Sequence, residues 1–232
     1  MLRGVFKSAV IAVSAAMFAS AAVPALAQNG MITNTGKASD AFPGLQKFLN
    51  LPAAERSQVN VYYNLRIKHC DASQVQATLN AAGKSVPLSI ARDGRVTPLP
   101  TRDQLNNGAT LTMTMPQTCT IGPKIKVYST QPAGRAFDAA GLSQGIRQGN
   151  SAMSKIAGAL AVTLKKLDRV YFVGSNDGTV EVNGQAKPLP KTTAGGEYPT
   201  GTPFFVPSDM PGATKITLNR PASVALFDTP EK

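Results

Sequence analysis

The feature that most constrains the fold of this chain is the alternation of apolar and polar residues in short stretches. The clearest stretch is 59–70, where Val61, Tyr63, Leu65 and Ile67 occupy alternate positions. Successive side chains of a strand point to opposite faces of a sheet, so a period of two predicts a half-buried strand. Similar patterns predict further short strands at 75–79, 86–91, 95–99, 111–115 and 125–127. A short helix capped by Asp71 is an alternative before the second of these strands.

Residues 138–167 have a different period. Ile156, Leu160, Leu164 and Leu167 recur at helical spacing, with Ala, Lys and Ser between them. Asp138 is a candidate cap for the beginning of the helix. We expect an interruption near Gly149-Asn150-Ser151, with Ser151 as a second cap.

The C-terminal part returns to strand patterns. Residues 169–173 and 179–182 flank Asn176-Asp177-Gly178, which is the strongest hairpin signal in the chain. Asn183-Gly184 marks a further turn. A Pro-, Gly- and Lys-rich loop is expected at 185–202, and three closing strands are expected at 204–206, 215–218 and 223–227.

Many short strands around one helical stretch predict a mainly β fold with a helical insert around 138–167. The β part is expected to be a β-sandwich or to resemble a barrel. The alternative is an α+β arrangement with two small β lobes. We expect a flexible lead-in at 28–40, a single β-rich domain at 41–228 with one or two helical turns at 41–56, and a tail at 229–232.

The first 27 residues have the organisation of a secretory signal peptide. Arg3 and Lys7 give a positive start, and 8–20 is almost wholly apolar or small. Ala25-Leu26-Ala27 matches the small-x-small pattern of a cleavage site. A membrane anchor is the alternative, but a spanning helix needs about 20 strongly apolar residues. We therefore expect cleavage near Ala27 and a periplasmic or secreted mature chain without a transmembrane span.

Export decides how the two cysteines are interpreted. Cys70 and Cys119 both lie in the mature part, and an even pair in an oxidising compartment predicts a disulfide. A redox pair is the alternative, but redox pairs usually have the spacing C-x-x-C. The sequence therefore predicts a structural bridge.

The candidates for catalysis lack the rest of a site. Gly141-Leu142-Ser143-Gln144-Gly145 matches the G-x-S-x-G motif of serine hydrolases, but the residues before it do not have a strand pattern. The only histidine, His69, precedes the serine, whereas the histidine follows it in that fold. His69-Cys70-Asp71 lies at the end of a predicted strand, where neighbours point to opposite faces and cannot share one metal ion. No catalytic residue, metal site or cofactor is therefore expected.

The basic balance is the remaining functional signal. The chain has 24 Lys and Arg against 13 Asp and Glu, a net charge of +11. Arg66 and Lys68 share one strand face, and Lys124 and Lys126 share another. Together these four residues are candidates for an anion-binding patch, flanked in phase by Tyr62 and Tyr128. The alternative is an ordinary solvated strand face that uses lysine to prevent aggregation.

These observations predict an exported, β-rich protein that acts by binding and not by catalysis. Its target is expected to be an anionic envelope component or a protein partner. Nucleic acid is not expected, because no recognition motif is present. Two alternatives stay open, a hydrolase that uses Ser143 and a structural subunit that adds its exposed strands to a partner.

Overall fold

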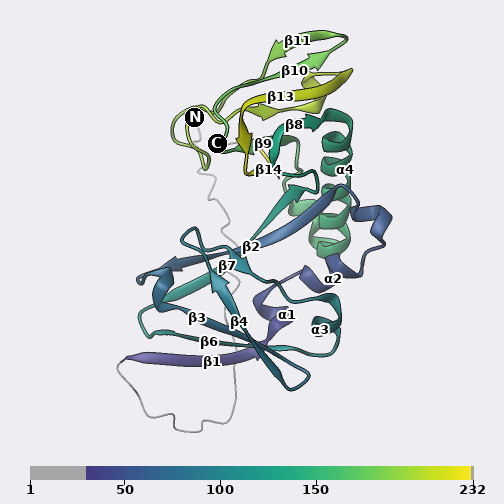
Figure 1. Cartoon of the computed structure of the whole chain (residues 1–232). Helices are drawn as coiled ribbons and strands as arrows, with labels where there is room; N and C mark the ends of the chain where they lie inside the picture. The colour runs from purple at the N-terminus through teal and green to yellow at the C-terminus, as the bar shows by residue number, and fades with distance from the viewer. Residues whose placement is uncertain (1–29, 231–232) are drawn as a thin grey trace, which may run out of the picture.

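The computed structural model describes residues 30–230, except the side chains of 159 and 160. The predicted signal peptide at 1–27 lies outside the described residues. Within them, the strands form three antiparallel sheets, which we call lower, central and upper after their places in Figure 1. The predicted mainly β fold with a helical insert is confirmed.

The lower sheet has the strand order β1-β6-β3-β4-β5. Its strands are β1 (Met31–Lys37), β3 (Gln76–Ala81), β4 (Lys84–Ile90), β5 (Val96–Thr97) and β6 (Thr110–Pro116). The expectation of a flexible lead-in at 28–40 is wrong over residues 31–40, because β1 pairs with β6 along its whole length and helix α1 (Ala38–Ala41) follows; residues 28 and 29 lie outside the described residues. β1 buries no side chain fully, so its sequence lacks the apolar alternation that identifies a strand.

The central sheet has the order β12-β9-β14-β7-β2. Its strands are β2 (Val59–Lys68), β7 (Thr120–Ser129), β9 (Arg169–Val173), β12 (Phe204–Phe205) and β14 (Val224–Asp228). The two long strands β2 and β7 pair residue for residue over ten positions, from Val59 with Ser129 to Lys68 with Thr120. This β2–β7 ribbon runs from the central sheet toward the lower sheet (Figure 1).

A disulfide joins Cys70 to Cys119 just beyond the last pair of the ribbon, with 5.3 Å between the two Cα atoms. The predicted bridge is confirmed. Every strand of the lower sheet except β1 lies between these cysteines in the chain. The lower sheet is thus largely an insertion between two paired strands, and the disulfide closes its base.

The upper sheet has the order β11-β10-β13-β8. Its strands are β8 (Gly134–Asp138), β10 (Gly178–Val182), β11 (Gln185–Pro188) and β13 (Ala213–Ala222). The predicted hairpin of 169–173 with 179–182 is wrong, because β9 pairs with β12 and β14 in the central sheet while β10 pairs with β11 and β13. The turn signal is real, but it carries the chain between two sheets. The hairpin lies at Asn183-Gly184, where both residues have positive φ, and 185–188 is a strand and not part of the predicted loop.

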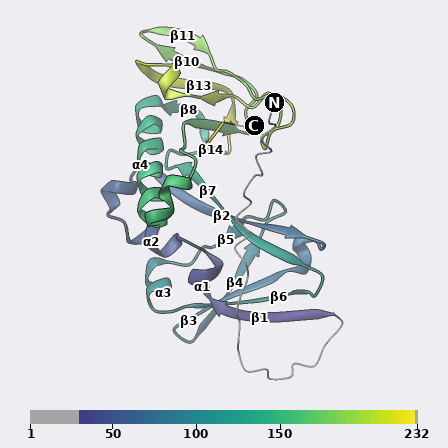
Figure 2. The ribbon, with the colours of Figure 1, turned by 180° about the vertical axis from the view of Figure 1, so that it is seen from behind.

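Helix α4 (Ala139–Ala157) packs against strands of both the central and the upper sheet (Figures 1 and 2). The predicted cap is confirmed, since the Asp138 carboxylate accepts from the Gly141 N–H. The predicted interruption and the second cap at Ser151 are wrong, because α4 continues to Ala157 before the 3-10 turn η3 (Gly158–Thr163). Asn150 holds this part of the helix through two hydrogen bonds of 2.8 Å to the Leu167 backbone.

The lower and central sheets meet at the turn between β4 and β5. The Leu65 N–H donates to the Gly94 carbonyl at 2.8 Å, and Asn64 donates to the Asp93 carbonyl at 2.8 Å. Helix α2 (Leu45–Asn50) follows Phe42 in the chain. Phe42 belongs to the same core as Tyr63 of β2. The remaining short helices are η1 (Ala53–Arg56), η2 (Ala72–Gln74), α3 (Arg102–Asn106) and η4 (Pro207–Asp209).

We expect removal of the disulfide to lower the free energy of unfolding by about 4 kcal/mol, the value of the chain-entropy model for a loop of about 50 residues. The variant is the double substitution Cys70→Ser, Cys119→Ser, compared with the oxidised wild type in urea unfolding. Unchanged stability, or two free thiols in the unfolded wild type without reductant, would contradict the structural role of the bridge.

Gly94 has no room for a side chain. A Cβ on Gly94 would lie 2.2 Å from the Leu65 carbonyl oxygen, and its φ is +83°. Gly83 is a matched control, because its φ is +74° and nothing lies within 4 Å of its added Cβ. We expect Gly83→Ala to lower the free energy of unfolding by about 1–2 kcal/mol through backbone strain alone. Gly94→Ala should cost about 2 kcal/mol more, because two backbones must separate. Equal losses in urea unfolding would show that the turn does not dock tightly on β2.

Candidate functional site

The candidate site lies on the face of the central sheet that is turned away from α4. Strand alternation places Val61 and Tyr63 in the core and Tyr62, Asn64 and Arg66 on the opposite face. Antiparallel register adds residues from the neighbouring strand to this face, since Tyr62 pairs with Lys126 and Asn64 pairs with Lys124. We call it the outer face of the ribbon.

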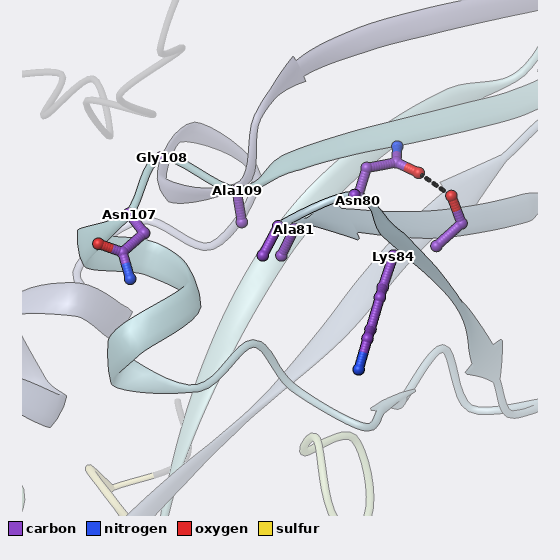
Figure 3. Close-up of a pocket in the computed structure, with 9 residues that line it drawn as sticks. Asn80, Ala81, Lys84, Asn107, Gly108 and Ala109 are labelled. Carbon is purple, nitrogen blue, oxygen red and sulfur yellow. Dashed lines mark hydrogen bonds between the residues drawn. The ribbon is translucent and has the colours of Figure 1, made fainter.

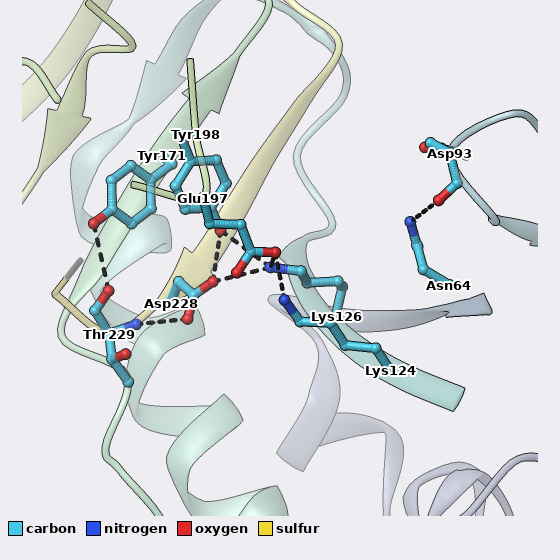
Figure 4. A network of polar contacts seen from close by, with 9 residues as sticks. All are labelled: Asn64, Asp93, Lys124, Lys126, Tyr171, Glu197, Tyr198, Asp228 and Thr229. Carbon is cyan, nitrogen blue, oxygen red and sulfur yellow. Dashed lines mark hydrogen bonds and ion pairs between the residues drawn. The ribbon is translucent and has the colours of Figure 1, made fainter. Parts of the chain in front are cut away.

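Two of the predicted basic residues are already engaged in ion pairs there. Lys126 Nζ lies 3.1 Å from Asp228 Oδ2 and 2.7 Å from Glu197 Oε1. Lys124 forms an ion pair with the same Glu197 oxygen. Figure 4 shows both ammonium groups pointing at the Glu197 carboxylate from the sheet below it. Lys126 is 8% exposed, so its charge needs a carboxylate partner in this position.

Tyr198, the residue after Glu197, is held in place by a ring contact and a hydrogen bond. Its ring stacks on Tyr171 with 4.0 Å between centroids, and its hydroxyl donates to Asp228 Oδ2 at 2.6 Å. Leu226 completes this small apolar cluster. Asp228 therefore joins the tyrosine and Lys126, and its position at the end of β14 sets the position of both.

The pKa values follow from burial opposed by these contacts. Burial alone would raise the pKa of Asp228, but the Tyr198 hydroxyl, the Thr229 N–H and Lys126 hold it below its usual range. Burial likewise opposes ionisation of Glu197, and the two lysines lower its pKa. Both carboxylates are therefore charged at neutral pH.

The two lysines differ in how far their carboxylate partners offset the effect of burial on the pKa. Burial would lower the pKa of Lys126, but Glu197 and Asp228 raise it above its ordinary value. Burial lowers the pKa of Lys124, and its single carboxylate partner does not offset this. Within residues 30–230, the charged form of Lys126 is thus stabilised by two carboxylates, whereas that of Lys124 is stabilised by Glu197.

Glu197 and Tyr198 belong to a loop between β11 and β12 that closes on itself, which we call the Glu197 loop (190–203). Its base is held by Thr192, whose N–H donates to the Thr202 carbonyl at 3.0 Å and whose hydroxyl donates to the Pro199 carbonyl at 2.7 Å. Residues 193–197 are exposed, while Thr192 and Tyr198 on either side are buried. The loop thus has two fixed points with an exposed segment between them.

A pocket of about 540 Å³ lies beside this network. Its lining brings Arg66 of β2 and Lys165, which follows η3, together with Gly195, Glu197, Tyr198 and Asp228. Within residues 30–230, neither Arg66 nor Lys165 forms an ion pair. Both side chains are exposed. Among the described residues, the pocket therefore has two cationic groups that form no ion pair, beside two carboxylates that are paired with Lys124 and Lys126.

The structure brings together three of the four predicted basic residues. Arg66, Lys124 and Lys126 lie around the pocket and its network, whereas Lys68 lies at the far end of the ribbon, about 20 Å along it from the position of Lys126. Tyr62 and Tyr128 contact each other on the same face, with ring centroids 5.5 Å apart. The guanidinium of Arg95 covers the Tyr62 ring at 4.1 Å.

Three residues of the site were missed at the sequence level, namely Glu197, Tyr198 and Asp228. Glu197 and Tyr198 follow Gly195 and Gly196, and a charged and an aromatic residue after a Gly-rich stretch of a long loop were the available signal. No local spacing relates Asp228 to Lys126, because the two meet only through strand pairing in the sheet.

A second, smaller pocket of about 300 Å³ lies in the lower sheet (Figure 3). It is formed by the turn between β3 and β4 and by Asn107, Gly108 and Ala109 before β6. Lys84 is its one charged lining residue. Its lining therefore has fewer charged side chains than that of the pocket beside Glu197.

The geometry around Ser143 does not support the hydrolase alternative. Strand β8 does precede the helix, which corrects the expectation that these residues lack a strand. Ser143, however, lies one turn inside α4, and its hydroxyl donates to the Ala139 carbonyl at 2.8 Å. A nucleophilic serine of this motif sits instead on the strained turn between strand and helix.

His69 is exposed at the end of β2, with φ +64°. Among residues 30–230, no three His, Cys, Asp or Glu side chains are grouped to hold a metal ion. In the same part of the chain, no helix is both long and apolar enough to cross a membrane.

No family model matches the chain, and no curated protein or solved structure is significantly similar to it.

We expect Asp228→Asn to lower the free energy of unfolding by about 1–3 kcal/mol at neutral pH, because the hydrogen bonds from Tyr198 and Lys126 lose their charged acceptor. The folded-state pKa of Asp228 lies below its ordinary 3.8, so the wild-type advantage is complete above that value and is lost as the pH falls through the folded-state pKa. Urea unfolding of both proteins from neutral to acid pH measures this.

The control for this prediction is Asp103→Asn, because Asp103 is exposed and pairs only with its neighbour Arg102. That substitution should leave stability nearly unchanged. A difference between wild type and Asp228→Asn that stays constant down to strongly acid pH would contradict the role of the ionised carboxylate.

Proposed function

We propose that this chain is an exported binding protein whose ligand carries an anionic group that enters the pocket beside Glu197. The observation that carries the proposal is the pair Arg66 and Lys165, which come from distant parts of the chain, line one pocket and form no ion pair within residues 30–230. Exposed cations in a concave site attract oxyanions, and Arg binds carboxylate or phosphate in a bidentate manner.

Export is supported by two independent features. The sequence of residues 1–27 has the pattern of a cleaved signal peptide, and the disulfide fits an oxidising compartment. The mature protein would then meet its ligand in the periplasm or outside the cell, where anionic envelope components and acidic protein surfaces are the available partners.

The test uses the mature chain from residue 28 and two labelled probes, polyglutamate for carboxylates and polyphosphate for phosphates. We expect Arg66→Glu, Lys165→Glu to weaken binding by about tenfold or more, since two attractive charges become repulsive. Wild-type affinity should fall steeply with added salt. Fluorescence anisotropy titrations at low and high salt measure both effects.

The control for overall charge is Lys187→Glu, Arg220→Glu. Both residues are exposed on the upper sheet, outside the pocket lining, and the substitution changes the net charge by the same amount. If both double variants weaken binding equally, the attraction is a property of the net charge and the proposed site is wrong.

A further inference from the structure

We infer that Glu197 is an internal occupant of the anion site, and that an external carboxylate or phosphate binds between Lys124 and Lys126 by displacing it. This inference rests on the proposed function and extends it, because it names the atoms that the ligand replaces. Glu197 Oε1 contacts both ammonium groups, which is the position that an oxygen of a bound oxyanion would take.

The loop is built so that Glu197 can leave without disturbing its neighbours. Tyr198 is fixed separately by the Tyr171 ring and by Asp228, and Thr192 fixes the other end of the exposed segment. Gly195 has φ +95° and open space around it, and Gly196 follows it. Between these fixed points, the ion pairs with Lys124 and Lys126 are the side-chain contacts that the structure gives Glu197 to the ribbon.

The displacement exchanges one anion for another on the same two ammonium groups. The Glu197 side chain is 48% exposed and that of Lys124 is 27% exposed, so water partly screens their pair, whereas the Lys126 side chain is 10% exposed. Lys126 keeps Asp228 as a partner when Glu197 leaves, so no buried charge is stranded. The site would then present Lys124, Lys126, Arg66 and Lys165 around the single carboxylate of Asp228.

The test is Glu197→Gln, which preserves size and removes the competing charge. We expect this variant to bind inorganic phosphate or acetate about two- to fivefold more tightly than the wild type, the factor that corresponds to an exposed ion pair. Titrations followed by amide resonances of Gly195 and Gly196 measure affinity and loop displacement together. The probe that gains affinity distinguishes a phosphate from a carboxylate ligand.

Two controls isolate the site. Glu55→Gln removes a carboxylate from another exposed ion pair, that with Lys155, and should leave anion affinity unchanged. Adding Lys124→Gln to Glu197→Gln should abolish the gain, because the vacated cation is then missing.

The outcomes separate the two proposals. Tighter binding by Glu197→Gln, with shifts at Gly195 and Gly196 in the titrated wild type, supports displacement. Equal or weaker binding by Glu197→Gln, while the Arg66 and Lys165 variant still loses affinity, overturns displacement and leaves the proposed function standing. Anion binding by neither wild type nor Glu197→Gln overturns both.

Discussion

The pairing of β2 with β7 is the interaction on which the rest of the structure depends. Ten residues of each strand lie in continuous register, and the two faces of this ribbon have different environments. The inner face supplies Val59, Val61, Tyr63 and Val127 to the core shared with α4. The outer face carries basic and aromatic side chains, namely Arg66, Lys124, Lys126, Tyr62 and Tyr128. A shift of one residue would exchange these faces, so burial of the inner side chains fixes the register and with it the site.

The same ribbon explains how the lower sheet is attached. Strands β3 to β6 lie between the paired strands in the sequence, and the Cys70–Cys119 bridge closes the point from which they leave. The turn at Gly94 then returns to β2, where the Gly94 carbonyl accepts a hydrogen bond from the Leu65 N–H. The insertion is thus held by a covalent link at its base and by a backbone contact along its side. Both contacts reach the strand that carries Arg66.

The charged network on the outer face combines a fixed part with an adjustable one. Lys126, Asp228 and Tyr198 are buried or half-buried and satisfy one another, which makes them costly to separate. Lys124 and Glu197 are more exposed and are joined by an ion pair of small net free energy. Under the proposed function, the fixed groups preserve the geometry of the site while the more exposed pair exchanges partners.

Sequence periodicity identified the strands that have one buried face, such as β2, β6 and β7. It missed β1, which is mostly polar, has no fully buried side chain and pairs with β6 along its whole length. It also joined β9 and β10 into one hairpin, since a turn signal specifies a local bend but not the sheet that each flanking strand enters. Helix α4 passed through its predicted break because Asn150 bonds to the Leu167 backbone, a contact that no helix propensity describes.

The sequence by itself determined the β-rich class, the helical segment capped by Asp138, the disulfide and the outward phase of Lys124 and Lys126 along one strand. These depend on local period, spacing and residue chemistry. Only the tertiary structure decided which charges meet. Glu197 arrives on a closed loop, Asp228 on the last strand and Lys165 after the helix, and each position depends on long-range pairing and packing. Strand pairing and core burial therefore bring cations that are scattered in the sequence together around one pocket.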